Sequence, residues 1–372
     1  MLTTTELILF GIFCFSAFIQ LLYYWLVFAR LAFYKEKEID PVDYPPVSVV
    51  IAARNEYHNL SRYLKNILEQ EYPEFEVIVV NHASNDETAD YLKEISPRYL
   101  NLKIVNIERE LNFFTGKKFP LSLGIKSAKY EHLLLTDADC IPESKHWISK
   151  MIRNYSETTE IVLGYGPYKK AKGMLNKIIR YDTFLTAMQY LSYALIGMPY
   201  MGVGRNLSYS KSMFFRSKGF TSHYKIASGD DDLFINKVAT RTNTRIEISP
   251  ESFMFSDAKT DFKSWIRQKM RHMTSGKLYK TKFKIVLSLF GLTQLLFYLF
   301  FFILLINNTI PLIVIGIFSL RFCTQLVVHK FVLGKLGEQN LFIFSLLWEV
   351  IHIFILQIVT IASIFRNRQV WN

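Results

Sequence analysis

The stretch EHLLLTDADCIPES, residues 131–144, runs from an apolar segment directly into two aspartates one residue apart. Its three leucines are typical of a buried strand, whereas aspartate is a poor strand former whose charge is costly to bury. Either a solvated turn ends the strand there, or a binding site uses the carboxylate oxygens of Asp137 and Asp139. The rest of the sequence favours the binding site.

The segments around this stretch alternate between strand-like and helix-like patterns. Apolar runs predict strands at 47–53, 75–80 and 102–107 and directly before Asp137. Helical spacing follows in HNLSRYLKNILEQ, in a segment capped near Ser84 or Asn85, and in FPLSLGIKSAKY. Such alternation predicts an α/β fold with a mostly parallel, doubly wound sheet.

Polar residues collect where these strands end. Asn55, Glu56, Asp86 and the Asp137/Asp139 pair all follow predicted strands, and ligands of doubly wound sheets bind beyond the carboxyl ends of the strands. No G-x-G-x-x-G follows the first strand and no G-x-x-x-x-G-K-[ST] occurs, which disfavours dinucleotide and P-loop enzymes. Carboxylates there suit Mg²⁺ or Mn²⁺ bridging a diphosphate.

Apolar segments at both ends of the chain predict an integral membrane protein. Four are long enough to cross a bilayer, at 7–28, 285–306, 310–328 and 341–365. Basic residues flank the polar middle of the chain, so the positive-inside rule places it in the cytoplasm. We therefore expect a multi-pass protein of the cell membrane. Its parts are an N-terminal anchor (1–33), a cytoplasmic domain ending in an amphipathic interface helix (34–275) and C-terminal transmembrane helices (276–372).

Two ionisable residues lie inside the predicted spans. Arg321 and Glu349 are expected to face the helix bundle, either as a structural pair or in contact with a lipid headgroup.

The net charge of +12 fits a membrane surface or a phosphate-bearing substrate. Nucleic-acid binding is disfavoured because no nucleic-acid motif accompanies the charge. Cys14, Cys140 and Cys323 show no metal spacing or disulfide framework.

Six motifs in order give the chain a family resemblance over residues 45–275. They are VVIAARNE (49–56), VVNHASNDET (79–88), the lysine-bearing segment that runs into DADC (116–140), GRNLSYSK (204–211), SGDDDL (228–233) and RQKMRH (267–272). Together they resemble a membrane-bound family 2 glycosyltransferase with a GT-A fold, of the ceramide glucosyltransferase and polysaccharide synthase branch.

This resemblance implies metal-dependent transfer of a sugar from a nucleotide diphosphate sugar to a hydroxyl, with inversion. It makes Asp139 the metal ligand, and it gives Asp137 either a water-mediated metal contact or a contact to the donor. The implied nucleotide-sugar contacts also include Ala53, Glu56, Asp86 and one of the neighbours Lys117 and Lys118.

The acceptor side is implied in the same way. Asp230 aligns with the catalytic base, and Asp231 is the second candidate; the alternative is a loop whose acidic residues begin a helix at Leu233. On the donor side, the resemblance also implies that Gln268 and Arg271 bind the nucleotide sugar. They are three apart, so they share a helix face, and Arg271 can make a forked contact to the diphosphate.

Two departures from the family pattern bear on the substrate. His82 stands where the family usually has an aspartate that contacts the base, which leaves uracil and guanine both open, with a UDP-sugar expected. His272 replaces the tryptophan of Q-x-x-R-W, which disfavours a processive enzyme. The expected acceptor is a membrane lipid or lipid-linked glycan. A processive polysaccharide synthase and a non-catalytic nucleotide-sugar-binding scaffold are the alternatives.

Overall fold

The structure is a computed structural model that describes residues 2–36, 44–108, 116–224, 226 and 228–364, without some side chains of the last helix. It contains two compact units. The helical unit comprises Met1–Lys35 and Tyr279–Ile358, and the α/β unit comprises Glu36–Leu278 and Val359–Asn372.

The α/β unit is built on a seven-stranded sheet in the order β3-β2-β1-β4-β7-β6-β8, beside a two-stranded sheet of β5 and β9. The strands are β1 Val47–Ala53, β2 Phe75–His82, β3 Leu102–Ile107, β4 His132–Asp137, β5 Cys140–Pro142, β6 Ile161–Gly164, β7 Leu207–Ser210, β8 Thr244–Glu247 and β9 Met254–Ser256. The first four strands of the order are parallel. β7 runs antiparallel to both β4 and β6, and β6 and β8 are parallel, so the sheet is mostly parallel, as predicted.

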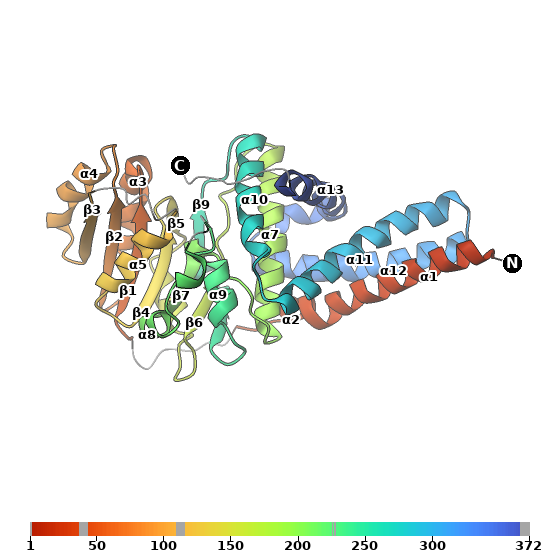
Figure 1. The fold of residues 1–372 in the computed structure, drawn as a ribbon, viewed down its shortest axis with the longest axis horizontal. Helices are drawn as coiled ribbons and strands as arrows, with labels where there is room; N and C mark the ends of the chain where they lie inside the picture. The colour runs from red at the N-terminus through yellow and green to blue at the C-terminus, as the bar shows by residue number, and fades with distance from the viewer. Residues whose placement is uncertain (1, 37–43, 109–115, 225, 227, 365–372) are drawn as a thin grey trace. The chain divides into compact units, whose positions relative to one another are not determined.

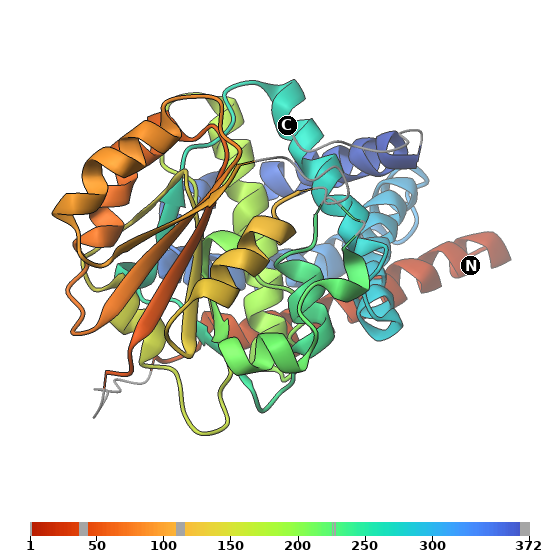
Figure 2. The same ribbon diagram turned by 60° about the vertical axis from the view of Figure 1, so that its left-hand side comes forward.

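Helices cover both faces of this sheet, which confirms the doubly wound fold (Figures 1 and 2). They are α3 Tyr57–Leu68, α4 Thr88–Ile95, α5 Lys118–Ser127, α6 Trp147–Ile152, α7 Met174–Leu195, α8 Lys211–Arg216, α9 Asp232–Val238 and α10 Phe262–Gly276. Val49 and Ile51 of β1 share a buried core with α3. On the other face α5 passes so close that a Cβ on Gly124 would lie 2.6 Å from Val50 Cγ1.

The strand register brings the ends of β1, β2 and β4 to one edge. Ala53 lies opposite Asn81 of β2, and Ala52 lies opposite Asp137 of β4. The loops after these strands therefore leave the sheet at the same level, which is where a doubly wound sheet binds its ligands.

The helical unit contains α1 Thr4–Leu22, the π-helical turns Tyr23–Phe28, α2 Ala29–Ala32, α11 Thr281–Ile306, α12 Pro311–Lys335 and, up to Ile358, α13 Ser345–Ile364. Among the described residues, three helices are long and apolar enough to cross a membrane, at Thr4–Ala32, Thr281–Ile306 and Pro311–Lys335. The fourth predicted span starts later than expected, because a 3₁₀ segment occupies Gln339–Phe344 before α13 begins. That this fourth segment crosses the membrane stays a prediction.

A buried ion pair joins the helices of this unit. Arg321 of α12 binds Glu349 of α13 at 2.6 Å, and both side chains are almost fully buried. Tyr298 and Gln294 of α11 each donate to Glu349 at 2.5 Å, while Arg321 also donates to Gln20 of α1 at 3.0 Å. Of the two interpretations of Arg321 and Glu349, the structure shows the structural pair, in a network to which four helices contribute side chains.

We expect Glu349→Gln to destabilise this unit, because it leaves the buried Arg321 guanidinium without a counter-charge. Breaking a buried pair from one side costs about 3–5 kcal/mol. The thermal midpoint of the detergent-solubilised protein should fall, and adding Arg321→Gln to the variant should restore part of the loss. Lys330→Gln on the exposed side of α12 is the matched control. An unchanged midpoint for Glu349→Gln would contradict the prediction.

Candidate functional site

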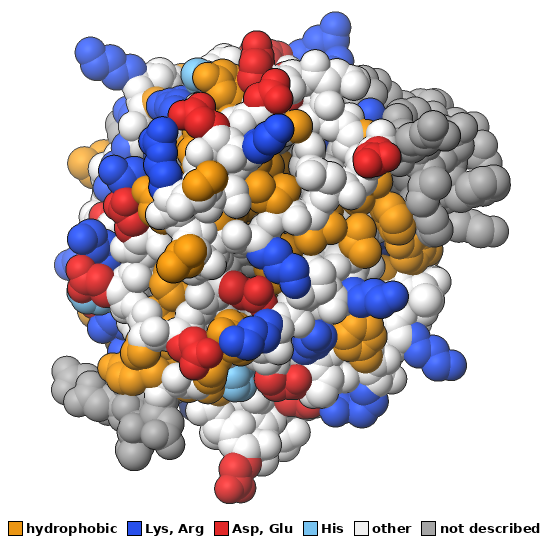
Figure 3. Space-filling model, turned by 90° about the vertical axis from the view of Figure 1, so that its left-hand side faces the viewer, with side chains coloured by type: hydrophobic (Ala, Val, Ile, Leu, Met, Phe, Trp, Pro, Cys, Tyr) orange, Lys and Arg blue, Asp and Glu red, His pale blue; other side chains and the backbone are white. Residues whose placement is uncertain are grey.

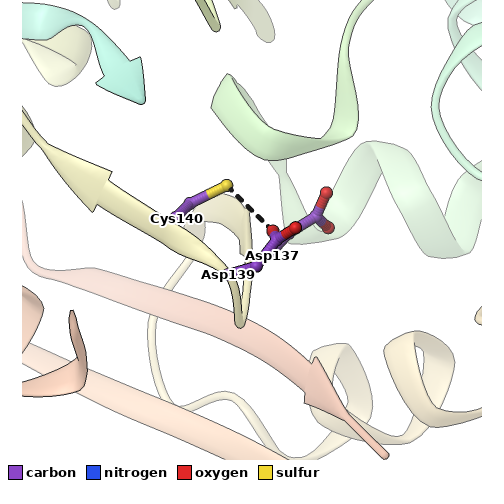
Figure 4. A group of neighbouring side chains, drawn as sticks. All are labelled: Asp137, Asp139 and Cys140. Carbon is purple, nitrogen blue, oxygen red and sulfur yellow. Dashed lines mark hydrogen bonds between the residues drawn. The ribbon is translucent and has the colours of Figure 1, made fainter. Parts of the chain in front are cut away.

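Of the two aspartates of the opening stretch, Asp137 ends β4 and Asp139 lies in the tight connection between β4 and β5. The ligand atoms of Asp137, Asp139 and Cys140 all lie within 4.8 Å of one another (Figure 4). The Cys140 thiol donates to Asp139 Oδ1 at 3.4 Å. Burial raises the pKa of this thiol well above its usual range, so it acts as a neutral donor that orients Asp139. Two carboxylates with accessible oxygens fit Mg²⁺ or Mn²⁺, which take one or two carboxylates beside substrate phosphates.

The neighbouring lysines at the start of α5 point to different places. Lys117 forms an ion pair with Asp137. Lys118 is fully buried, and its Nζ donates to the carbonyl oxygens of Ile226, at 2.5 Å, and Ser228. The sequence left both lysines as candidate contacts to the nucleotide sugar. Of the two, only Lys117 pairs with Asp137 of the predicted metal site.

Glu56 reaches the same edge from the start of α3. Burial raises the pKa of its carboxyl, the hydrogen bond from Asn59 opposes this, and the charge of Asp139 adds to the rise. Ala53 ends β1 with its side chain in the core, so only its backbone can contact a ligand.

Asp86 anchors the starts of two helices. Its oxygens accept from the backbone N–H of Tyr57, at the start of α3, and from that of Thr88, at the start of α4, both at 3.1 Å. Burial alone would raise the pKa of Asp86, but the hydrogen bonds from Thr88 and Tyr57 outweigh it and lower the pKa. The predicted cap near Ser84 or Asn85 is wrong, because α4 begins at Thr88 and Asp86 accepts its first N–H. The nucleotide contact of Asp86 stays a prediction.

Three consecutive aspartates precede and begin α9, and each has different surroundings. Asp231 accepts from the backbone N–H of Gly204 at 2.8 Å and from that of Asp232 at 2.7 Å. Burial, followed by the charges of Asp230 and Asp232, raises the pKa of Asp231 to about 7. Asp232 is buried and accepts from Ser275 of α10. In the described part of the chain, no hydrogen bond or ion pair holds the Asp230 carboxylate, so it is the one available to a substrate.

α10 carries the predicted Gln268 and Arg271. The Gln268 amide donates to Tyr168 Oη at 3.2 Å. Lys269 binds both oxygens of Asp182 of α7, at 2.7 and 2.8 Å. No carboxylate pairs with the Arg271 guanidinium within the ranges that the structure describes, so its charge is available to a ligand.

Arg205 belongs to this edge, although it was not among the predicted site residues. Its guanidinium lies over the Tyr168 ring at 4.4 Å and donates to Ser256 Oγ at 3.0 Å. Gly166 makes room for it, since a Cβ there would lie 2.5 Å from Arg205 Nε. Burial alone would lower the pKa of Arg205, but the charges around it, including that of Asp139, raise the pKa. Its position inside the GRNLSYSK motif is the feature of the sequence that could have identified Arg205 as a site residue.

Comparison with protein families decides the relationship. The model for Glycosyl transferase family group 2 matches residues 151–361, more than half of the chain, and the model for Glycosyl transferase family 2 matches residues 48–217. The chain belongs to glycosyltransferase family 2. The resemblance drawn from the six motifs is thereby confirmed.

This family 2 glycosyltransferase is similar to several curated proteins. It is 25% identical over 287 residues to the probable glycosyltransferase YdaM of Bacillus subtilis, which covers 72% of this chain and 66% of that protein. It is 35% identical over 95 residues to a poly-beta-1,6-N-acetyl-D-glucosamine synthase of Staphylococcus epidermidis, covering 26% of this chain and 22% of that protein. The matches thus span about two thirds or less of these relatives.

A solved structure shares the fold. The mannosyltransferase PcManGT from Pyrobaculum calidifontis, in complex with GDP-Man and Mn²⁺, superposes with a TM-score of 0.58 at 19% identity, covering 93% of this chain and 98% of that one. The similarity supports the GT-A assignment of the sheet and its helices.

The two departures from the family pattern lie in different surroundings. His82 ends β2, buried, with its ring 6.3 Å from that of Phe119 on α5. His272 lies on an exposed position of α10 beside the positive charges of Arg271 and Lys269, and its pKa is lowered. His272 is therefore neutral at neutral pH and adds no charge to the site.

Basic and acidic side chains are interspersed on the face drawn in Figure 3, with apolar side chains between them. The described atoms of that face form no continuous basic stripe of the kind that tracks a nucleic-acid backbone.

Proposed function

We propose that this chain is an inverting, metal-dependent glycosyltransferase. It moves a sugar from a nucleotide diphosphate sugar to a hydroxyl of a membrane lipid or a lipid-linked cell-envelope acceptor. One observation carries the proposal. Adjacent residues of α5 reach both halves of such a site, because Lys117 pairs with Asp137 while Lys118 binds the segment directly before Asp230.

On the donor side, the leaving diphosphate gathers negative charge that must be stabilised. Asp139, with Asp137, would hold Mg²⁺ or Mn²⁺, which supplies charge neutralisation at the diphosphate. Lys117 and Arg271 add fixed positive charges. Arg271 lies close to the base segment, since Ser228 Oγ donates to the Arg271 carbonyl at 3.4 Å.

On the acceptor side, the hydroxyl needs a base because its own pKa is far above neutrality. The Asp230 carboxylate is available for that proton. Asp231 is already engaged with two backbone N–H groups, which makes it a support for the turn. A single base that activates the incoming hydroxyl, with no covalent sugar–enzyme intermediate, gives inversion at the anomeric carbon.

The membrane acceptor is supported by the three apolar helices, at Thr4–Ala32, Thr281–Ile306 and Pro311–Lys335. We place the catalytic domain (34–275) in the cytoplasm, between an N-terminal anchor (1–33) and the C-terminal helices (276–372), because basic residues flank the domain. A UDP-sugar is the proposed donor. Because the structurally similar mannosyltransferase is in complex with GDP-Man, GDP-sugars are also tested as donors.

A processive polysaccharide synthase is the second candidate. The stretch that is 35% identical to the Staphylococcus epidermidis synthase favours it. His272 in the place of the usual tryptophan favours single addition.

The test is a transfer assay on membranes that contain the full chain. They are incubated with radiolabelled UDP- and GDP-sugars and Mn²⁺, and the products are partitioned between organic solvent and water. Membranes that contain Asp230→Asn give the background. Label in the organic phase supports the glycolipid product, and label in large water-soluble material supports the processive synthase. Label at background level with every donor would contradict a glycosyltransferase of either kind.

A further inference from the structure

Lys118 is a buried cation that itself takes no part in the proposed sugar or proton transfer. Its side chain has 0% of its surface exposed at the start of α5. A buried ammonium is costly unless hydrogen bonds and opposite charges surround it. Lys118 has both, because it donates to the carbonyl oxygens of Ile226 and Ser228 and lies close to the three aspartates that precede and begin α9.

Both bonds of Lys118 end on the backbone that leads into Asp230. Ser228 lies two residues before that carboxylate, and Gly229 between them has a φ of 96°, a conformation that side-chain-bearing residues rarely adopt. The carbonyl groups of Ile226 and Ser228 lie before this glycine turn. Lys118 provides two hydrogen bonds from the neighbouring helix.

The charge of Lys118 also faces three like charges in a row. Asp230 makes the largest electrostatic contribution to Lys118, followed by Asp232 and Asp231. Three adjacent carboxylates disfavour one another's ionised forms, and a cation beside them favours those forms. Burial and then the aspartate charges act in opposite directions on the pKa of Lys118, and burial prevails, which lowers it.

Other titratable groups face the aspartates from the surrounding elements. Burial, followed by the charge of Lys118, lowers the pKa of His223 to about 4, so this side chain is neutral at neutral pH. Burial raises the pKa of Tyr209 of β7 and of Tyr200, so both stay protonated. Lys237 of α9 donates to the Ser217 carbonyl at 2.5 Å. His223, Tyr209 and Tyr200 therefore do not titrate near neutrality, whereas burial raises the pKa of Asp231 to about 7.

We infer that Lys118 is a positioning residue for the base. It fixes the backbone before Asp230 through two carbonyl groups, and its positive charge favours the ionised forms of the neighbouring aspartates. The inference rests on the proposed function, in which Asp230 accepts the proton of the acceptor hydroxyl. It makes α5 a shared support, with Lys117 at the donor aspartates and Lys118 at the base.

The test is the pH profile of kcat/KM for three variants of the full chain in membranes. Lys118→Met removes the charge and the hydrogen bonds, Lys118→Gln keeps a hydrogen-bond donor without the charge, and Lys118→Arg keeps the charge. Loss of a cation raises the pKa of a nearby carboxylate, by about 1 unit or more at contact distance. Because the ionised base is the active form, the acidic limb of the profile should move up by about that amount in Lys118→Met and Lys118→Gln. Lys118→Arg should keep the limb close to that of the unchanged protein.

Lys126→Met, on the exposed side of the same helix, is the matched control and should leave the profile unchanged. The dissociation constant for the nucleoside diphosphate with Mn²⁺, measured by calorimetry, should stay within about threefold in each variant that folds. Should Lys118→Met not fold, Lys118→Gln carries the test, because its amide can still donate to a carbonyl oxygen.

The outcomes separate this inference from the proposed function. An unchanged protein that transfers no sugar overturns the proposed function. An active unchanged protein, with variants whose rates fall equally at every pH, overturns the role of the charge and leaves Lys118 a purely structural residue. The inference is supported if the acidic limb of the profile moves to higher pH in Lys118→Gln and returns to its original pH in Lys118→Arg.

Discussion

Asp230→Asn is expected to abolish sugar transfer while donor binding is retained. The amide has nearly the shape of the carboxylate but cannot accept the proton of the acceptor hydroxyl. Loss of a positioned general base lowers kcat by about 10²–10⁴-fold. The measurement is a single-turnover transfer rate alongside the dissociation constant of the nucleoside diphosphate with Mn²⁺. A rate that falls with an unchanged dissociation constant is the expected result.

Two matched variants make this prediction specific. Asp90→Asn removes an exposed carboxylate from the first turn of α4 and should leave transfer and binding unchanged. Asp231→Asn places an amide NH₂ against one of the two backbone N–H groups that Asp231 now binds, so it should lower the thermal midpoint. Full transfer by Asp230→Asn, together with loss of transfer in a folded Asp231→Asn, would move the base to Asp231.

Asp139→Asn is expected to abolish the transfer that depends on Mn²⁺. An amide oxygen has no charge and is a weaker ligand for a hard divalent ion than a carboxylate. Changes to groups that only support a metal ligand already lower metal affinity by about 10–100-fold, so loss of the ligand itself should exceed this range. Titrating Mn²⁺ against both transfer and nucleoside diphosphate binding gives two readouts of the same site.

Cys140→Ser is the control for this second prediction. A serine hydroxyl still donates a hydrogen bond to Asp139, so metal dependence should survive. Mn²⁺ could instead activate the Asp139→Asn variant with the same affinity as the unchanged protein. Asp139 would then not be a metal ligand, and Asp137 would be the remaining candidate.

The sequence determines the half of the sheet that carries the donor aspartates. The predicted strands 47–53 and 102–107 coincide with β1 and β3. β1 is buried on both faces and almost wholly apolar, as an inner parallel strand should be, whereas the edge strand β3 exposes Lys103 and Asn106 between its apolar residues. The other half was not predicted. β6, β7 and β8 have only four residues each, and β7 lies between β4 and β6 in an orientation that only long-range pairing determines.

The residues of the site could likewise be predicted only in part. Acidic residues at strand ends could be read directly, because parallel strands deliver them to one edge. Lys117 and Lys118 could not be distinguished, since adjacent residues at a helix start point in different directions that depend on the surroundings. Arg205 was missed because its partners, Tyr168, Ser256 and Gly166, are distant in the sequence.

The attachment of Asp86 to two helix starts has a consequence for reading mutants of this protein. One carboxylate serves two N–H groups through two equivalent oxygens, from Tyr57 and from Thr88. Asparagine offers a single acceptor and turns a donor toward the second N–H, and alanine offers neither. Reduced donor binding in such a variant would therefore mix a lost contact with a displaced loop. Loss of function at this position is ambiguous evidence, whereas loss at Asp230, which has no structural partner in the described residues, is informative.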